Sequence, residues 1–297
     1  MKLKAMVIRN IKLFFKDKGM FFTSLVTPMI LLVLYVTFLG KTYKDSFSTA
    51  VPEGLVTSNG LIEATVGGEL ISSILAVCCV TVAFCSNMLM VQDKVSGARN
   101  DLLIAPVKRS VLAMGYYIAT VFSTLIVCVI ALGAGLLYVG QIGWYMSGAD
   151  IAWILVDVVL LVLFGTALSS IINIFLSTQG QISAVGTIVS AGYGFICGAY
   201  MPISNFGGGL KKVLSFLPGT YGTSLLRNHA MRGAFAQMEA DGFPVEVVEA
   251  IRESVDCKLY FFGSEVTLTA MYLYLGATVF ALIVIYILLN VGIRFKK

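Results

Sequence analysis

The chain has 297 residues, of which 58% are hydrophobic and only 12% are charged. A soluble domain carries about 25% charged residues, so this composition excludes an ordinary soluble protein. The net charge of +5 is modest, and the positions of the basic residues explain it as membrane topology without a nucleic-acid partner. We therefore expect an all-α polytopic membrane protein.

Residues 1–19 predict an amphipathic helix that lies along the inner leaflet of the membrane. Apolar side chains repeat at helical spacing on one face, at Leu3, Val7, Ile11 and Phe14. Basic side chains share another face, at Lys2, Arg9, Lys12 and Lys16. A plain positive-inside anchor explains the same pattern. The next apolar run is too long for a secretory signal and lacks a small-residue cleavage site, so we expect no cleaved signal peptide.

Residues 20–297 are expected to form one transmembrane domain of six helices. A helix needs about 20 mainly apolar residues to cross a bilayer. The segments of that kind are Met20 to Leu39, Leu70 to Val91, Val111 to Val139, Ile151 to Leu176, Ile182 to Met201 and Val266 to Val291. With a cytoplasmic N-terminus, 13 of the 21 Lys and Arg residues fall in the short cytoplasmic segments. The positive-inside rule therefore places both termini in the cytoplasm.

A polar interruption, residues 92–110, separates the second and third expected spans. Its sequence, QDKVSGARNDLLIAPVKRS, carries four basic and two acidic side chains. Basic residues beside spans are retained in the cytoplasm, so the segment predicts a short cytoplasmic turn that carries a helix. The run LeuLeuIle next to Pro106 indicates that a partner docks there, because a solvated turn needs no such run. A solvated turn without a partner is the alternative.

Two outer loops are long, Gly40 to Glu69 and residues 202–265. The first part of the second loop is apolar but is broken by Pro202, the glycines 207–209 and Pro218. Irregular backbone is not tolerated against lipid, so we expect short re-entrant helices packed on the bundle instead of a seventh span. The second part, about Arg232 to Lys258, is polar and predicts an exposed helical cap.

The sequence offers no catalytic or metal-binding constellation. The six cysteines include no C-x-x-C pair, and the only histidine, His229, has no ligand spacing around it, so we expect a structural role for it. The glycines 207–209 lack the pattern of a phosphate-binding loop, so we do not expect this chain to bind ATP. Asp157 is the only charged residue deep in a span. A functional carboxylate, a snorkelling side chain and a polar contact between helices remain open for it.

Three features in this order resemble the permease subunits of type-2 ABC exporters, which are related to the membrane half of the ABC G subfamily. They are the amphipathic N-terminal helix, the turn DKVSGARNDLLIAPVKRSVLAMGYY and the later segment GAYMPISNFGGGLKKVLSFLPGTYGTSLLR. The resemblance covers essentially the whole chain. The turn matches the family pattern at Asp93, Gly97, Leu102, Leu103, Pro106 and Arg109, although the family often has glutamate at the first position. The later segment matches a G-x-x-x-P pattern and a second proline at Gly198, Pro202 and Pro218, with Tyr221.

The resemblance implies that two permeases, identical or paired with a sister chain, enclose a pathway. Separate ABC ATPase subunits would bind ATP and Mg and dock on the cytoplasmic side, so this chain would hold no cofactor and no catalytic residue. The central turn would form the coupling helix, with an apolar anchor and a polar rim. The anchor would be Leu102, Leu103 and Ile104, and the rim Asp93, Arg99 and Arg109. We expect a cell-membrane exporter of an apolar or amphipathic substrate such as a drug, a lipid or a peptide-like molecule.

The resemblance would also place the pathway between the second and fifth spans of the two protomers. The second span offers Thr81, Phe84, Asn87 and Met88 on one helical face. Asn173, Tyr193 and Phe195 are further candidates, and ordinary helix packing explains all seven equally. Cys257 is the only cysteine in an outer loop, so an intersubunit disulfide and a shielded free thiol are both open.

Two other protein classes are weaker alternatives. A self-sufficient secondary transporter is expected to show inverted repeats, broken helices in matching halves or coupling carboxylates, and the sequence shows no convincing repeat. An intramembrane enzyme needs a nucleophile and a base that converge, which one histidine in a loop does not provide. The exporter permease is therefore the preferred interpretation.

Overall fold

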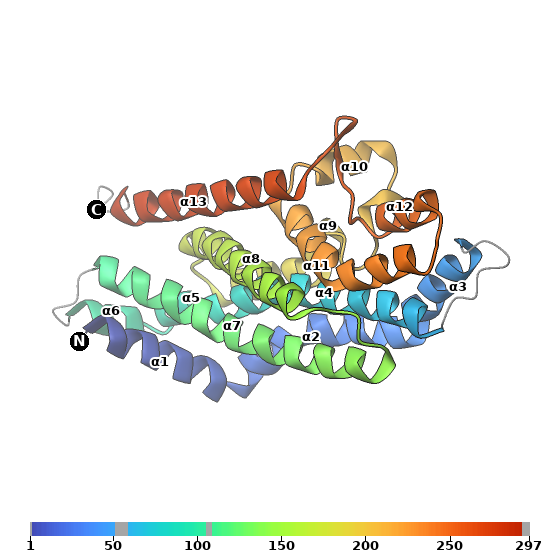
Figure 1. Ribbon diagram of the computed structural model, residues 1–297. Helices are drawn as coiled ribbons and strands as arrows, with labels where there is room; N and C mark the ends of the chain where they lie inside the picture. The colour runs from blue at the N-terminus through green and yellow to red at the C-terminus, as the bar shows by residue number, and fades with distance from the viewer. Residues whose placement is uncertain (1, 51–58, 105–108, 293–297) are drawn as a thin grey trace.

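The structure is a computed structural model that describes residues 2–50, 59–104 and 109–292. Helices make up almost all of this part of the chain (Figure 1), which confirms the predicted all-α class. In chain order the elements are α1 (Lys2–Lys16), α2 (Lys18–Leu34), a π-helix (Tyr35–Leu39), α3 (Gly40–Ala50), α4 (Asn59–Asn87), α5 (Leu89–Val95), α6 (Ala98–Ile104), α7 (Arg109–Ile142), α8 (Gly148–Phe175), α9 (Gln179–Ile196), a 3-10 turn (Ile203–Asn205), α10 (Gly208–Leu214), α11 (Pro218–Ala240), α12 (Val245–Ser254), β1 (Tyr260–Phe261), β2 (Ser264–Glu265) and α13 (Leu268–Gly292).

Five helical segments of the described chain are long and apolar enough to cross a membrane. They are Lys18–Asp45, Gly60–Val95, Ser110–Ile142, Gly148–Phe175 and Leu268–Asn290. The expected fifth span, Ile182 to Met201, falls on α9, which has only 18 residues and two glutamines in its first turn. Such a helix rises about 27 Å, less than the roughly 30 Å of a bilayer core. The polytopic class is thus confirmed, but the number of long apolar helices is five instead of six.

Helix α4 lies at the centre of the bundle. Its side chains are buried on all sides, among them Val77, Cys79 and Val80, and it packs against α2, α7, α8 and α11. A helix that is hydrophobic all round is stable in such an interior or in lipid. Gly165 of α8 allows the closest approach, because a Cβ atom there would lie 2.8 Å from the carbonyl oxygen of Cys79. Bulky residues at that position are therefore excluded.

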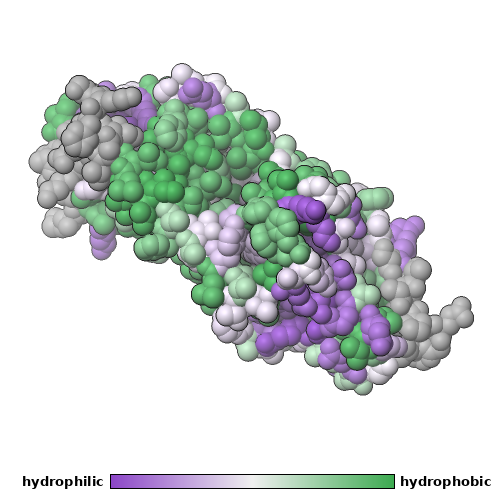
Figure 2. Space-filling view, turned by 90° about the horizontal axis from the view of Figure 1, so that it is seen from above, coloured by the Kyte–Doolittle hydropathy of each residue, from purple (hydrophilic) through white to green (hydrophobic). Residues whose placement is uncertain are grey.

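The surface of the bundle is apolar where it faces outward. Helix α13 exposes most of its side chains, and Phe280 is 72% exposed. Figure 2 shows a broad hydrophobic area on the face that carries α13, while hydrophilic side chains gather toward the opposite end. An exposed apolar area of this extent in a soluble protein would cause aggregation, so it is a surface for lipid or for another chain.

The first expected outer loop, Gly40 to Glu69, is largely helical instead. Helix α2 continues through the π-helix into α3, and α4 already begins at Asn59. The reason is an apolar contact that the loop prediction missed: Phe47 of α3 is buried and its ring stacks on Tyr43, 6.3 Å away. This side of α3 packs against a second core cluster that includes Met231 and Phe235 of α11.

Helix α11 runs unbroken from Pro218, which occupies a first-turn position where its missing N–H costs nothing. Its first residues lie inside the bundle, where Gly219 contacts Tyr193 of α9 and Gly222 contacts Leu161 of α8. Its later part reaches the turn between α7 and α8, where Gly233 lies against the carbonyl of Tyr145. The helix is continuous through Arg232, the position at which the expected polar cap was to begin. Beyond α11, the segment expected to be an exposed cap buries Val248 and other apolar side chains of α12 against this helix.

Candidate functional site

The turn between α4 and α7 forms two short helices at the end of the bundle that also carries α1. Helix α5 ends at Val95, and Gly97 then adopts a φ of +82° before α6 begins. This left-handed backbone favours glycine, which has no Cβ atom. Space is not the reason for glycine, since nothing lies within 4 Å of a Cβ built there. The predicted helix-bearing turn is therefore an α5–α6 corner.

One carboxylate joins three helices at this corner. Arg9 of α1 donates two hydrogen bonds to Asp93 of α5, from Nη1 to Oδ2 at 2.8 Å and from Nη2 to Oδ1 at 3.1 Å. Tyr116 of α7 donates a third to Oδ2 at 2.5 Å. The forked guanidinium matches a carboxylate in this two-point geometry. We call Arg9, Asp93 and Tyr116 the α1–α5–α7 junction.

Asp93 thus differs from the expectation that it lies on an exposed polar rim. Only 5% of the residue is exposed, and its three hydrogen bonds come from within the chain. A buried carboxylate is stable only when such donors replace water. Sequence reasoning missed Arg9 as the partner because it lies 84 residues away, and no local spacing indicates the pair.

Helix α1 is amphipathic as predicted, but a different face is buried. Met6, Asn10 and Phe14 are buried, while Leu3 is exposed. Met6 contacts Gly115 of α7, where a Cβ atom would lie 3.0 Å from the methionine. Helix α1 therefore packs along α7, and the turn of the helix that carries Arg9 faces the corner.

The next residue, Lys94, joins the corner to a fourth helix. Its Nζ donates to the carbonyl oxygens of Asn173 and Ile174, both at 2.9 Å, and of Leu176 at 3.2 Å. These are carbonyls at the C-terminal end of α8, where a cation stabilises unpaired acceptors and the negative end of the helix dipole. Adjacent residues of α5 thus connect it to α1, α7 and α8.

The other residues predicted for coupling divide into two groups. Arg99 and Leu102 are half-buried, with Leu102 packed against the main core, whereas Ile104 at the end of α6 is 84% exposed. Pro106 and the side chains of Leu103 and Arg109 lie outside the described residues. Among the described side chains of α6, Ile104 is therefore the large apolar one exposed to solvent or to a partner.

The residues predicted to line a pathway are mostly enclosed within this chain. Six are buried: Thr81, Phe84, Asn87, Met88, Asn173 and Tyr193. Asn87 donates to the hydroxyls of Ser169 at 3.0 Å and Ser170 at 2.8 Å on α8. Phe195 is 51% exposed and packs edge-on against Tyr200. In the described part of this chain, six of the seven side chains are therefore enclosed between helices, and Phe195 is the exposed one among the seven.

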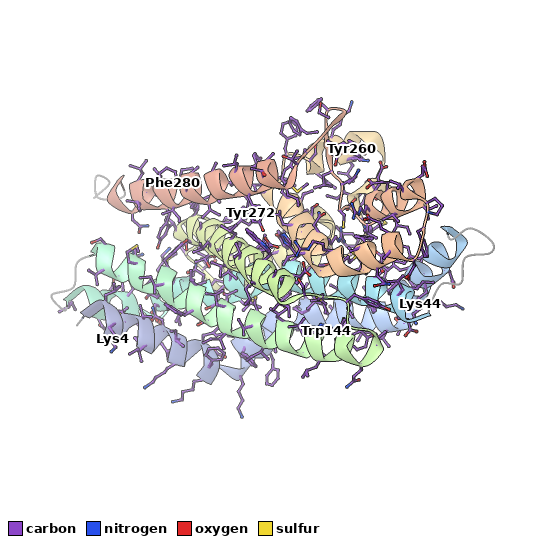
Figure 3. All side chains as sticks on the ribbon, in the orientation of Figure 1. Lys4, Lys44, Trp144, Tyr260, Tyr272 and Phe280 are labelled. Atoms are coloured by element: carbon purple, nitrogen blue, oxygen red, sulfur yellow. The ribbon has the colours of Figure 1, made fainter. Side chains whose placement is uncertain are left out.

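Asp157 and His229, which the sequence indicated separately, contact each other. Asp157 Oδ2 lies 2.6 Å from His229 Nδ1, and Tyr272 donates to Oδ1 at 2.5 Å. Trp153 stacks on the imidazole at 5.7 Å. Figure 3 places Tyr272 between α13 and α8. Asp157 is therefore a polar contact that joins α8, α11 and α13, and snorkelling is excluded because the side chain is fully buried.

Arg227 of α11 is a buried cation that the sequence analysis did not single out. Its guanidinium lies 2.5 Å from Glu69 of α4 and 3.2 Å from Asp256, and it donates to the carbonyl of Gly198 at 2.7 Å. The sequence signal that could have indicated a buried cation is the position of Arg227, which directly follows the apolar pair Leu225 and Leu226. Its two carboxylate partners lie far away in sequence, so they were not recognisable.

The cysteines of the described chain are all free and buried. Cys257 packs among apolar side chains of the α11–α12 cluster, and burial raises the pKa of its thiol well above the ordinary value. A protonated, buried thiol is a poor nucleophile, so this position does not favour an intersubunit disulfide. Cys79 and Cys128 contact each other between α4 and α7, with 3.7 Å between the sulfurs.

Comparison with known proteins identifies a family. The model of the ABC-2 type transporter family matches residues 1–230, about three quarters of the chain. No curated protein matches the sequence, and no solved structure matches it. The matched range contains the α1–α5–α7 junction, the α5–α6 corner and the Asp157–His229 contact.

Proposed function

Because the chain belongs to the ABC-2 type transporter family, as the match over residues 1–230 shows, we propose that it is the permease subunit of an exporter. The family domain is the membrane component of an ABC transporter and is not itself catalytic. In our proposal, a separate ABC ATPase binds ATP and Mg, and its hydrolysis moves an apolar or amphipathic substrate outward across the cell membrane.

The observation that carries the proposal is the construction of the α5–α6 corner. Ile104 is exposed on α6, while Asp93 and Lys94 on the preceding helix join α5 to α1, α7 and α8. A partner that contacts α6 therefore acts on a segment fixed to three other helices. Since a ligand shifts an equilibrium only by its preference for one state, the ATPase must contact this corner differently before and after hydrolysis.

A second permease, identical or a sister chain, completes the proposed pathway. Helix α9 supports this arrangement because it exposes Ile188 and Phe195, and its 18 residues are at the short end of the length that a span needs. An exposed helix of this kind is stable in a membrane when another helix covers its polar turns. The basic residues of the expected cytoplasmic segments support cytoplasmic termini.

The charges of the bundle support an apolar or amphipathic substrate. Asp157 is satisfied by His229 and Tyr272, and Glu69 is paired with Arg227. Transport of a charged solute would require charged groups that are free to bind it. The substrate classes that we propose are therefore drugs, lipids and peptide-like molecules.

The Asp157–His229 contact favours one second candidate, a proton-driven secondary transporter. Buried carboxylate and imidazole groups form proton relays in such proteins. The two candidates differ in energy source, so we would measure uptake of a fluorescent amphipathic dye into inside-out vesicles that contain the chain and its ATPase. The exporter account predicts uptake that requires ATP and is blocked by vanadate. Uptake that needs only a proton gradient and is abolished by a protonophore would instead establish the second candidate.

A further inference from the structure

The contact between Asp157 and His229 lies near the end of the bundle where α8 and α13 begin. Asp157 is in the third turn of α8, and Tyr272 is in the second turn of α13. In the proposed topology this is the outer end. Trp153, one turn before Asp157, is 45% exposed, and 7% of the His229 side chain is exposed. Tryptophan and tyrosine concentrate at membrane–water interfaces, so the imidazole lies within reach of water on the outer side.

The carboxylate of Asp157 determines where the imidazole carries its hydrogen. Oδ1 accepts from the Tyr272 hydroxyl at 2.5 Å, and Oδ2 lies 2.6 Å from Nδ1 of His229. An ionised carboxylate only accepts hydrogen bonds, so Nδ1 of the neutral ring is the donor. Nε2 is then the nitrogen that takes up a second proton, as imidazole does between about pH 5 and 8.

Two neighbours favour the protonated ring. Asp157 places an opposite charge at hydrogen-bond distance, which favours the charged form of its partner. The indole of Trp153 is stacked on the imidazole, with 5.7 Å between the ring centroids and 14° between the planes. A cation within about 6 Å of an indole centroid is attracted to its face. Uptake of a proton therefore strengthens the contact that joins α8, α11 and α13.

Other charged groups beside α11 form ion pairs of their own. They are Glu69 of α4 and Asp256 with Arg227, Asp150 of α8 with Arg232, and Arg252 of α12 with Glu239. Helix α13 contains no Asp, Glu, His, Lys or Arg. The response of the three-helix contact to pH therefore depends on His229 and Asp157.

The described helices offer a proton at His229 no series of charged groups toward the cytoplasmic corner. No Asp, Glu, His, Lys or Arg follows Asp157 in α8. None occurs in residues 70–92 of α4 and α5 or in residues 110–142 of α7. Proton relays in membranes consist of such groups in series. The arrangement thus suits a site that takes up and releases its proton on one side.

We propose that His229 senses the pH of the outer side and that its protonation slows export. This inference rests on the exporter function proposed above. Helix α11 touches α9 at its first turn, where a Cβ atom at Gly219 would lie 2.7 Å from the Tyr193 hydroxyl. When the imidazolium ties α11 to α8 and α13, the outer end of α9 is held as well. A proton that binds preferentially to this state shifts the equilibrium away from the state that releases substrate.

Proton binding is measured by fluorescence of the full chain in right-side-out vesicles, because protonated imidazole quenches the emission of a stacked indole. The variant Trp144→Phe leaves Trp153 as the only tryptophan. We expect its emission to fall when the outer solution is acidified from about pH 8 to pH 5, and to stay constant when only the inner side is acidified. The control is Trp153→Phe, which leaves Trp144, a residue that does not stack on His229 in the described chain.

The variant His229→Asn, made in the Trp144→Phe chain, should abolish the fluorescence change, because its amide can donate to Asp157 but does not titrate. His229→Gln serves the same purpose if the Asn variant fails to fold. Three results would each overturn the proposal: a change that persists without His229, constant emission in the chain that retains it, and an equal response to acid on either side.

The effect on transport is measured as ATP-driven uptake of a dye without titratable groups into inside-out vesicles, whose lumen is buffered at about pH 8 or pH 5. We expect wild-type uptake to be severalfold slower with the acidic lumen, and His229→Asn to transport at one rate in both. Equal wild-type rates would overturn the regulatory role. Uptake that fails at both pH values would contradict the exporter function and the inference about transport with it. The fluorescence change needs no ATPase, so it distinguishes these two failures.

Discussion

At the scale of single residues, buried charges connect helices that are distant in the sequence. Arg227 is fully enclosed, with carboxylates on two sides and a carbonyl on a third. A buried ion pair adds little net stability when it is complete, but removal of one member leaves an unpaired charge in the interior. The pairs therefore fix how the helices are arranged.

Replacement Arg227→Gln should destabilise the chain by about 3–5 kcal/mol, because Glu69 and Asp256 lose their cation in the interior. Glu239→Gln is the control, since Glu239 lies on the same helix with its side chain 51% exposed and pairs with Arg252, which is itself partly exposed. Such surface changes usually stay within about 0.5 kcal/mol. Thermal unfolding in detergent compares the two, and similar Tm values would contradict a structural role for Arg227.

Replacement Arg9→Gln should impair coupling. Asp93 would keep only the Tyr116 hydroxyl as a hydrogen-bond donor, and an unsatisfied buried group costs about 1–3 kcal/mol. We expect substrate-stimulated ATPase activity to fall severalfold while the ATPase still co-purifies. Lys12→Gln, on the exposed side of the same helix, should leave the activity unchanged. A loss of activity with both variants would point to membrane charge instead of the junction.

Replacement Asp157→Asn separates the two transport mechanisms. The amide retains the size of the carboxylate but cannot ionise. Under the exporter account, ATP-driven transport by the variant persists at most of the wild-type rate, because Asp157 only joins α8, α11 and α13. Abolished transport in a variant of normal stability and expression would favour proton coupling.

At the scale of elements, the exposed end of α6 is the expected site of contact with the ATPase. Ile104→Glu places a charge in the proposed apolar contact and should weaken binding of the ATPase about tenfold or more, since about 1.4 kcal/mol corresponds to each factor of ten. Asn100→Glu adds the same charge to an exposed polar position of α6 and serves as the control. Co-purification and ATPase activity measure both. Unchanged binding by Ile104→Glu would remove α6 from the interface.

The elements also show which predictions the sequence permits. Helices with long uninterrupted apolar runs, such as α8 and α13, were predicted within a few residues, because hydrophobic length alone defines them. Helix α4 begins at Asn59 instead of the expected Leu70, because its more polar first turns are also buried in the bundle. The expected span at α9 is shorter, since its polar first turn and the turn at Gly198 limit the helix. The sequence did not indicate which face of α1 packs on the bundle, because Asn10, a polar residue, belongs to the buried side.

At the scale of the whole molecule, the arrangement is a central α4 surrounded by helices whose outer faces are apolar. The sequence predicted this class and the position of the α5–α6 corner. It did not predict that Asp93 faces inward or that Asp157 meets His229, because those contacts join segments 72 to 84 residues apart. Pairing over such separations follows from tertiary packing, which no spacing within one sequence reveals.

The central claim is that this permease works with a separate ABC ATPase. The most direct test is affinity purification of the tagged chain from its native membrane in mild detergent, followed by mass identification of partners and an ATPase assay. We predict a stoichiometric ABC ATPase subunit and vanadate-sensitive hydrolysis. A chain recovered alone, without ATPase activity in several detergents, would contradict the account.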